Sequence, residues 1–240
     1  MTIRLHLDFQ PDATHIALAK KQAHYLEKVL RLKHNDRLVI FNGIDGEFEA
    51  EFLKTGSNCH LQIIKKTRDF IRPLNLTLCY APVKNVKTDF IAKKAAELGI
   101  TSIQPIITEY TIVRKVNVEK LNLSMIEGIE QCGRIDVLDI HNEVALPKFL
   151  KHNPDKLMLF FDETGSGKTP NQLKSDLGRV TNQEIAILIG PEGGFSKQEA
   201  ELINAMPQTL NISLGQRILR ADTAIIAAAT IVNSYCRDWL

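Results

Sequence analysis

The segment EIAILIGPEGGFSKQE, residues 184–199, decides the fold of this 240-residue chain. Its first half is a run of apolar residues ending at Gly190, which is typical of a strand buried on both faces. A loop with three glycines follows. Ser196 and, three positions later, Glu199 then form a capping box at the start of a helical pattern. A buried strand, a turn and a capped helix in succession predict an α/β fold with a parallel sheet.

The same alternation extends over residues 73–240 in both directions from this segment. Thr88 and Asp222 are expected to cap two of the helices, Gly99 to end one, and Pro170 to open one. Ligands of such sheets bind at the carboxyl ends of the strands. The expected strands are 74–83, 102–108, 156–162, 184–190 and 209–215, and the expected helices are 88–99, 123–134, 169–178, 196–206 and 222–236.

Residues 1–72 have a different, strand-rich pattern. The segment IDGEFEAEFL, residues 44–53, contains an Asp-Gly turn followed by alternating apolar residues, as in a hairpin. One helix is expected near residues 20–32, with Ala23, Leu26, Val29 and Leu30 on its inner face. We therefore expect a small antiparallel barrel with one helix, separated from the α/β region at Pro73.

Composition and charge exclude few functions. No apolar stretch is long enough to span a membrane and the N-terminus lacks a signal-peptide core, so a cytoplasmic location is expected. The four cysteines and seven histidines are scattered without metal-binding spacing, so no metal is expected. The net charge is +2, but residues 1–72 carry 12 Lys/Arg against 9 Asp/Glu. That surplus fits an RNA-binding surface or an ordinary solvated surface.

The segment DETGSGKTP, residues 162–170, resembles a phosphate-binding P-loop only in part. A Walker A loop has the pattern G-x-x-x-x-G-K-[ST], and its first glycine would fall at Asp162. Asp162 and Glu163 would repel the phosphates of a nucleotide. A nucleoside triphosphatase is therefore disfavoured, and the alternatives are a surface turn or one wall of a pocket at the end of the preceding strand.

The glycine loop within LIGPEGGFSKQE, residues 188–199, is the stronger candidate site. Gly193 and Gly194 permit positive φ and close approach of a ligand to the backbone. Glu192 disfavours a pyrophosphate but suits a neutral or cationic ligand, such as the sulfonium of S-adenosylmethionine (SAM). The alternative is that the segment is only a tight connector.

A second loop, SLGQRILRADTA, residues 213–224, also joins a strand to a helix. Ile218 and Leu219 are apolar residues in a loop, which suggests the wall of an apolar pocket such as one for adenine. Arg217 and Arg220 are three residues apart. Each arginine is either a surface cation or a contact to phosphate or substrate.

These two loops resemble the bacterial RsmE family, the 16S ribosomal RNA uridine-1498 N3-methyltransferases. Three further segments agree: AHYLEKVLRLKHNDRLVIFNG (23–43), TDFIAKKAAELGI (88–100) and IEQCGR (129–134). The resemblance implies a PUA-like RNA-binding barrel over residues 1–72. It also implies a SPOUT methyltransferase domain over 73–240, with a trefoil knot that holds SAM. A homodimer acting on the small ribosomal subunit is implied as well.

The resemblance also assigns residues to roles. Arg220 would orient the uridine, and Glu130 and Gln131 match a family block that also contains Arg134. The sequence departs from the family pattern at Asp222, which puts a catalytic role there in doubt. The implied cofactor contacts are Phe161, Ile189, Gly190, Pro191, Glu192, Gly193, Leu214, Gly215, Ile218 and Leu219. The implied RNA contacts are Arg4, Arg31, Lys84, Lys87, Arg134 and Arg217.

Several alternatives remain open on the sequence alone. The chain could be a SPOUT enzyme acting on another RNA site, or a non-catalytic RNA-binding dimer. Glu192, Asp222 and Glu130 are equally possible general bases. The last helix is apolar on nearly all sides, which fits either a core helix or a dimer contact.

Overall fold

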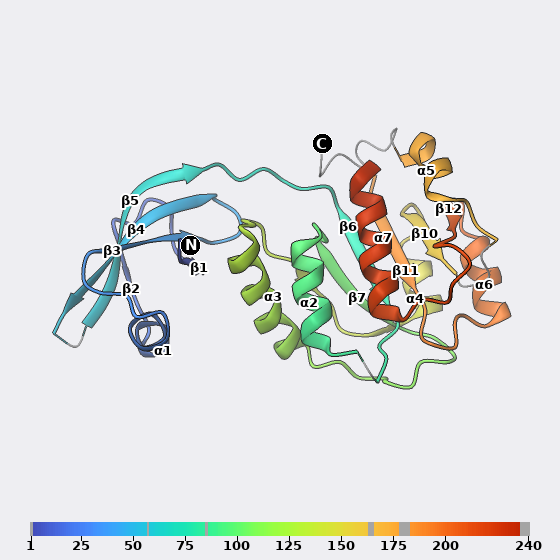
Figure 1. Cartoon of the computed structure of the whole chain (residues 1–240), viewed down its shortest axis with the longest axis horizontal. Coiled ribbons are helices and arrows are strands. Elements are labelled where there is room, and N and C mark those ends of the chain that lie inside the picture. The colour runs from blue at the N-terminus through green and yellow to red at the C-terminus, as the bar shows by residue number, and fades with distance from the viewer. Residues whose placement is uncertain (1, 57, 85, 163–165, 178–182, 236–240) are drawn as a thin grey trace. The chain divides into compact units, whose positions relative to one another are not determined.

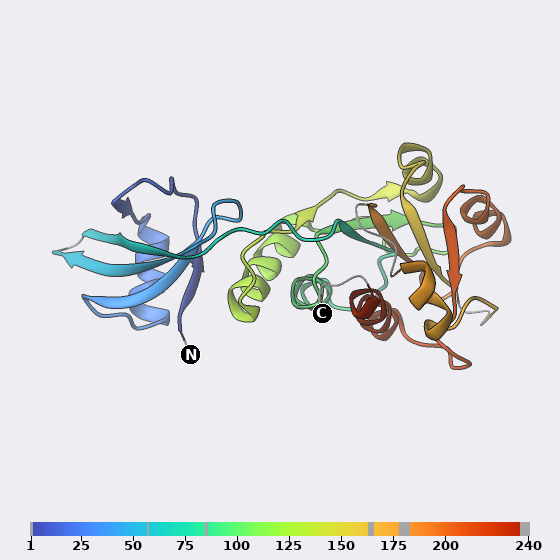
Figure 2. The same cartoon turned by 90° about the horizontal axis from the view of Figure 1, so that it is seen from above.

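The computed structural model describes residues 2–56, 58–84, 86–162, 166–177 and 183–235. The chain divides into two compact units (Figures 1 and 2). The first unit comprises residues 1–72 together with 129–137, and the second comprises 73–128 and 138–240. The sequence pattern did not indicate that residues 129–137 would pack with the N-terminal region.

The first unit is built on a five-stranded sheet in the order β1-β3-β4-β5-β2. All neighbouring strands pair antiparallel except β1 and β3, which are parallel. The expectation of a purely antiparallel barrel is therefore wrong at its first strand. The elements are β1 (Arg4–His6), β2 (His15–Ala17), α1 (Lys20–His24), the π-helical turn η1 (Tyr25–Val29), β3 (Asp36–Phe41), β4 (Glu47–Thr55) and β5 (Asn58–Arg68).

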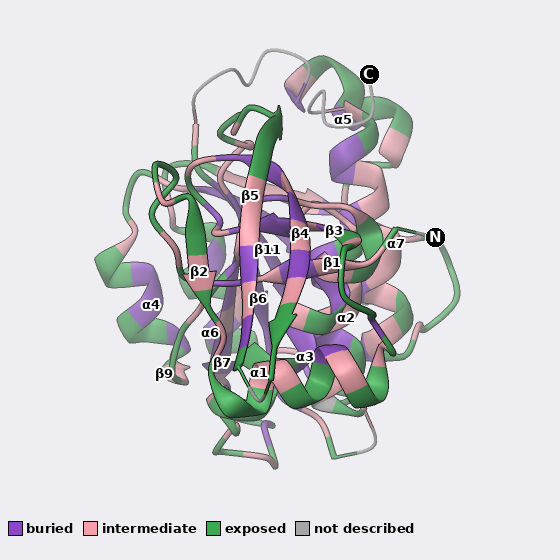
Figure 3. Ribbon diagram, turned by 90° about the vertical axis from the view of Figure 1, so that its left-hand side faces the viewer, coloured by how far each residue is buried: buried purple, intermediate pink, exposed green. Residues whose placement is uncertain are grey.

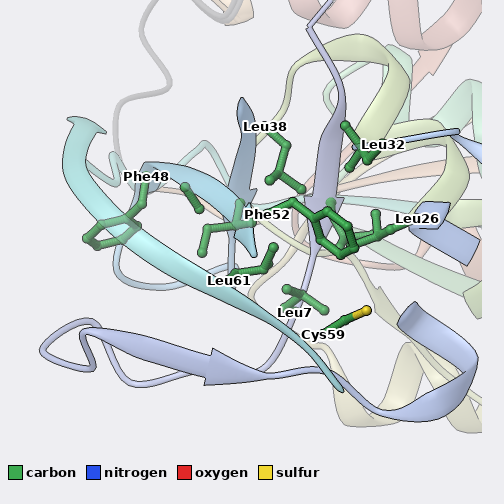
Figure 4. Packing of buried hydrophobic residues seen from close by; sticks show 11 residues of the cluster. Leu7, Leu26, Leu32, Leu38, Phe48, Phe52, Cys59 and Leu61 are labelled. Carbon is green, nitrogen blue, oxygen red and sulfur yellow. The ribbon is translucent and has the colours of Figure 1, made fainter. Parts of the chain in front are cut away.

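The core of this unit lies between the sheet and the helical segment (Figure 4). Leu26, Phe52 and Leu61 are fully buried in it. Ala23 and Leu30 pack against its edge. Val29 is 59% exposed, so its expected place on the inner face is wrong. A π turn takes more residues per turn than an α-helix, and the inward positions shift accordingly.

The second unit contains a parallel sheet in the order β12-β10-β11-β6-β7-β8, and β9 also pairs with β7. The parallel sheet expected from the sequence is confirmed. Its strands are β6 (Leu76–Tyr80), β7 (Ser102–Ile107), β8 (Asp139–Ile140), β9 (Val144–Ala145), β10 (Leu157–Phe161), β11 (Ile185–Ile189) and β12 (Thr209–Ile212). Its helices are α2 (Thr88–Glu97), α3 (Val118–Cys132, whose end lies in the first unit), α4 (Leu146–His152), α5 (Pro170–Leu177), α6 (Lys197–Asn204) and α7 (Ala221–Tyr235).

Helices cover the sheet, and its central strands are buried along their whole length (Figure 3). Leu146, Phe149 and Leu150 of α4 and Ile203 of α6 pack against side chains of β6, β10 and β11. α2 and α7 contact each other, and α7 also contacts β11. The trefoil knot implied by the resemblance stays a prediction.

The last helix, α7, is buried on one face only. Ile225, Ala228, Ala229 and Val232 face the interior. Ile226, on the remaining surface, is only partly covered within the chain. Of the two alternatives left open by the sequence, a core helix covered on all sides is not observed within one chain, and a dimer contact through the outer face remains a prediction.

Helix boundaries agree with most of the cap signals. Ser196 and Glu199 form the expected capping box. Gly99 adopts φ +69° just after α2, as a C-terminal glycine should. Lys87, not Thr88, occupies the N-cap position of α2. Asp222 is not the N-cap of α7 either, because it lies within the first turn and accepts the N–H of Thr223 at 2.8 Å.

Candidate active site

A cavity lies at the carboxyl ends of β10, β11 and β12, where the sheet geometry predicts a ligand site. The space between its lining residues is about 590 Å³, and this volume includes open solvent at the mouth. Three loops and the first turn of α7 enclose it. Its lining residues are Phe161, Asp162, Ile189, Gly190, Pro191, Glu192, Leu214, Gly215, Arg217, Ile218, Leu219, Ala221 and Ala224.

The cavity brings together nine of the ten residues expected to contact the cofactor, and Gly193 is the exception. Four lining residues were not among the expected cofactor contacts: Asp162, Arg217, Ala221 and Ala224. Ala221 and Ala224 are three apart on α7, so they share one side of its first turn. In the sequence, these two small residues just after the second loop could have indicated that the first turn of α7 lines the cavity.

The chemistry of the lining fits a ligand with an apolar ring and a positive charge. Phe161, Ile189 and Leu219 supply apolar surface, and the two acidic side chains, Asp162 and Glu192, can face a cation. A pyrophosphate would meet these carboxylates instead of a cluster of cations. The residues present therefore fit SAM better than a nucleoside triphosphate.

Gly190 is required by packing beneath the first loop. A Cβ at Gly190 would lie 2.8 Å from Cε2 of Phe195. The Phe195 ring in turn packs edge-on against Phe160, with centroids 5.1 Å apart. Among the loop glycines, Gly194 has φ +67°, whereas Gly193 is not in the positive-φ region, so the expected role of Gly193 there is wrong.

The first loop is anchored to a neighbouring turn through Glu199. Besides capping α6, the Glu199 carboxylate accepts the backbone N–H of Glu109 at 2.9 Å. This turn is closed by buried Thr108 and Thr111, whose hydroxyls lie 2.7 Å apart. Tyr110, on the same turn, lies beside Gly193 and is half exposed. The first loop is thus tied, through the start of α6, to the turn after β7.

The second loop turns sharply as it leaves β12. Gly215 has φ +99° and donates its N–H to Ser213 Oγ at 3.1 Å. Arg217 and Ile218 line the cavity and are exposed, Ile218 to 83%. Such an exposed apolar side chain at a cavity mouth provides surface that a bound ligand can cover.

Arg220 lies between Leu219 and Ala221, which both line the cavity, although its own side chain does not. Its carbonyl accepts the N–H of Ala224 at 2.8 Å and so begins α7. The side chain is exposed, and neither Arg220 nor Arg217 has an ion pair among the described residues. Both side chains are therefore accessible on this loop, and that of Arg217 lines the cavity.

The P-loop-like segment is held in a way that does not suit phosphate binding. Lys168 forms a parallel bridge with Ile212 and donates its backbone N–H to Asn211 at 2.7 Å. A Cβ at Gly167 would lie 2.6 Å from the backbone of Asn211, so this glycine serves packing against β12. The part of the expected cofactor loop at residues 163–165 lies outside the described residues.

Two of the expected RNA contacts are engaged within the first unit. Arg4 pairs with Glu47 and donates to the carbonyl of Arg134 at 2.9 Å. Arg134 binds Asp136, with Nε 2.7 Å from Oδ1, and its side chain is only 9% exposed. These guanidinium groups stabilise the packing of residues 129–137 and are therefore engaged within the unit.

The remaining expected RNA contacts are accessible. Arg31, Lys84 and Lys87 are all exposed. Lys84 and Lys87 follow β6, at the same edge of the sheet as the cavity. Glu130 of the family block accepts the backbone N–H of His6 at 2.9 Å, a structural contact.

The described residues contain no cluster of three metal-binding side chains and no helix long and apolar enough to cross a membrane. Cys59 and Cys79 are buried free thiols and Cys132 is exposed, whereas Cys236 lies outside the described residues.

Comparison with known families agrees with this geometry. Residues 71–233 match the family described as RNA methyltransferase domain, and residues 18–64 match the RNA methyltransferase PUA domain. A ribosomal RNA small subunit methyltransferase E from Rickettsia conorii is 37% identical, covering 90% of this chain and 88% of the relative. The chain belongs to the ribosomal RNA small subunit methyltransferase E family.

Solved structures of similar proteins extend over the whole chain. A ribosomal RNA small subunit methyltransferase E from Neisseria gonorrhoeae, bound to SAM, superimposes with a TM-score of 0.83 and 26% identity, covering 98% of each chain. The Legionella pneumophila protein Lpg2936, described as a methyltransferase and in complex with SAM, has a TM-score of 0.82 and 29% identity, again over 98% of each chain. The α/β fold preceded by a PUA domain is thereby confirmed.

Proposed function

We propose that this chain transfers a methyl group from SAM to N3 of uridine 1498 in 16S ribosomal RNA. The observation that carries the proposal is the cavity formed jointly by the loops after β11 and β12, with Arg217 in its lining and the exposed Arg220 on the same loop. Membership of the family and the SAM-bound relatives support the cofactor and the RNA class. The base and the atom come from the resemblance to the family.

Different residues of the cavity are proposed to bind different parts of SAM. Phe161, Ile189 and Leu219 would pack against the adenine, and the backbone of the two loops would meet its polar edge. Glu192 or Asp162 would face the sulfonium. When bound, SAM supplies an electrophilic methyl group on a positively charged sulfur.

The target atom sets a further requirement. N3 of uracil carries a weakly acidic proton, and it must lose this proton before it can attack the methyl group. Arg220 would stabilise the resulting uracil anion, because its guanidinium is always charged and offers several donors. Arg217 lines the cavity and is the second cation within reach of the same region. Glu192 is the candidate base that lines the cavity.

The target must also be accessible. N3 is paired in an RNA duplex, so the uridine has to be unpaired or extruded when it reaches the cavity. The surface cations Lys84 and Lys87 are proposed to hold the RNA backbone near the sheet edge. We also propose that two copies of the chain form a homodimer through the outer face of α7. A cytoplasmic location follows from the proposed ribosomal substrate.

Transfer of labelled methyl groups tests the proposal. Small ribosomal subunits from cells that lack the modification, incubated with the purified chain and labelled SAM, should gain about one methyl group per subunit. Subunits that already carry the modification are the control and should gain none. No incorporation, despite measurable RNA binding, would favour a non-catalytic RNA-binding protein.

A further inference from the structure

Tyr110 has an aromatic side chain that the fold holds in place but leaves half exposed. It lies in the turn that follows β7, and its exposed fraction is 48%. Thr108 and Thr111, which close the turn, are each only 3% exposed. An aromatic ring carried by an otherwise buried turn presents a flat apolar face that a ligand can reach.

The backbone of this turn is fixed by hydrogen bonds on both sides of Tyr110. The N–H of Thr111 donates to the carbonyl of Thr108 at 3.2 Å, and the N–H of Thr108 donates to Thr111 Oγ1 at 2.9 Å. The N–H of Glu109 donates to the Glu199 carboxylate at 2.9 Å, and the same carboxylate caps α6. Since Glu199 is buried, the position of Tyr110 relative to the glycine loop is set by the fold.

Tyr110 packs against that glycine loop, which forms one wall of the cavity. Cβ of Tyr110 lies 3.4 Å, and Cγ and Cδ2 lie 3.6 Å, from the position that a Cβ would take at Gly193. Gly193 directly follows Pro191 and Glu192, which both line the cavity. The ring therefore lies next to a wall of the cavity without being part of its lining.

The surroundings of the ring suit an unpaired nucleotide. The Tyr110 hydroxyl has no hydrogen bond among the described residues. Arg114 and Lys115, further along the same loop, are exposed and have no ion pair in the part of the chain that the structure describes. Proteins bind unpaired bases by combining an exposed aromatic face with nearby cations. Phe161, the aromatic residue of the cavity lining, is buried and is already proposed to pack against adenine.

We propose that Tyr110 stacks on the base of the uridine that receives the methyl group. This inference rests on the proposed function and deepens it, because it names the residue that receives the extruded base. An extruded uracil has lost its stacking neighbours, and an aromatic face beside the cavity offsets part of that cost. Stacking uses only the face of the base, so the N3 edge stays free to meet the methyl donor.

Methylation of small subunits that lack the modification, measured over a range of subunit concentrations, tests the inference. Tyr110→Ala should lower kcat/KM for RNA about 10- to 100-fold, as expected when a base loses its stacking partner. Tyr110→Phe keeps the ring and should stay within about twofold of wild type. Tyr110→Leu keeps apolar bulk beside Gly193 but has no π face, so it should be nearly as slow as Tyr110→Ala.

Leu202→Ala is the matched control, because Leu202 of α6 is 47% exposed and lies in the same unit. It should leave kcat/KM within about twofold of wild type. A Tyr110→Leu chain as fast as Tyr110→Phe would overturn the inference, since apolar bulk alone would then be enough. Weaker SAM binding by Tyr110→Ala would overturn it in favour of a cofactor contact, and a changed oligomeric state in favour of a contact with a second copy.

Fluorescence distinguishes failure of this inference from failure of the proposed reaction. With Trp239, the chain's one tryptophan, changed to Phe, Tyr110→Trp places a single indole at the turn. A 16S RNA fragment containing uridine 1498 should quench this indole, and the same fragment with an abasic nucleotide at that position should not. If the wild-type chain transfers no methyl group but this difference is observed, the proposed reaction fails and the stacking stands. Equal fluorescence with both fragments would overturn the stacking.

Discussion

The ammonium group of Lys168 lies 2.7 Å from the carboxylate of Asp176 on α5. A P-loop lysine must be free to reach the phosphates of a nucleotide, whereas this one is paired and its backbone is bridged to β12. In the segment that resembles a nucleotide-binding loop, Lys168 therefore contacts β12 and α5 instead of being free to bind a phosphate.

The first prediction is that SAM stabilises the folded chain and ATP does not. SAM at a hundredfold excess over its dissociation constant should raise the melting temperature by roughly 5–10 °C, because it binds only the folded chain. ATP with magnesium should leave it unchanged. Differential scanning fluorimetry makes the comparison, and stabilisation by ATP alone would restore the nucleoside triphosphatase hypothesis.

The second prediction concerns Arg220. Arg220→Ala should bind SAM with unchanged affinity but lower kcat/KM for RNA by a factor of about 10²–10³, as for loss of one group that stabilises a developing anion. Calorimetry measures SAM affinity, and single-turnover methylation measures the rate. Arg220→Lys keeps the charge and should recover part of the activity. An Arg220→Ala variant as fast as wild type would remove this residue from the mechanism.

The third prediction compares two glycines of the first loop. Gly190→Ala should destabilise the chain by about 1–3 kcal/mol and weaken SAM binding, because its Cβ would overlap the Phe195 ring. Gly193→Ala is the control, since a Cβ there would lie 3.4 Å from Tyr110, within ordinary contact. Denaturant unfolding and SAM titration separate the two. Equal effects would show that the Phe195 contact does not set the requirement for glycine.

The fourth prediction concerns Arg4, which forms an ion pair with Glu47 and donates a hydrogen bond to the carbonyl of Arg134. Arg4 is largely buried with Glu47, and its guanidinium also packs on the Phe41 ring at 5.0 Å. Arg4→Ala should lower the free energy of unfolding by about 2–4 kcal/mol, since it leaves the Glu47 carboxylate short of a partner. Urea unfolding at neutral pH measures it, and a loss below about 0.5 kcal/mol would contradict the structural role.

The fifth prediction is the pH dependence of the same pair. Burial alone would raise the pKa of Glu47, but hydrogen bonds from Arg4 and Thr67 outweigh it and lower the pKa below its ordinary value of 4.5. The ionised form is thus favoured by folding. Its contribution is present above pH 4.5 and is lost as the pH falls through the lowered folded value. The stability gap between wild type and Glu47→Gln should accordingly narrow below pH 4.5, and a gap that widens would contradict it.

Much of the second unit could be predicted from the sequence, because its signals are local. The apolar runs at residues 157–161 and 185–189 are strands buried on both faces. The Ser196 and Glu199 capping box fixes the start of α6. Once these strands are known to be parallel, the loops that follow them must lie together at the carboxyl ends of the strands. Nine of the residues that line the cavity could therefore be named from the sequence.

The predictions that were wrong concern residues whose structure depends on contacts with other parts of the unit. Arg4 and Arg134 were expected to bind RNA, but Arg4 pairs with Glu47, 43 residues away, and donates to the carbonyl of Arg134, 130 residues away. The burial of Arg134 likewise follows from the folding of the unit. The parallel pairing of β1 with β3 and the π turn at η1 likewise depend on packing rather than on local preference. Helical periodicity placed Val29 inside because it assumed 3.6 residues per turn throughout.

The most direct test of the account is the position and atom of the methyl group. Small subunits methylated by the purified chain should, after nuclease digestion and mass spectrometry, contain 3-methyluridine at position 1498 of 16S RNA and no other new methylated nucleoside. The Arg220→Ala chain, treated identically, should leave that position largely unmodified. A methyl group on another base or another atom, or none at all with SAM bound in the cavity, would contradict the account.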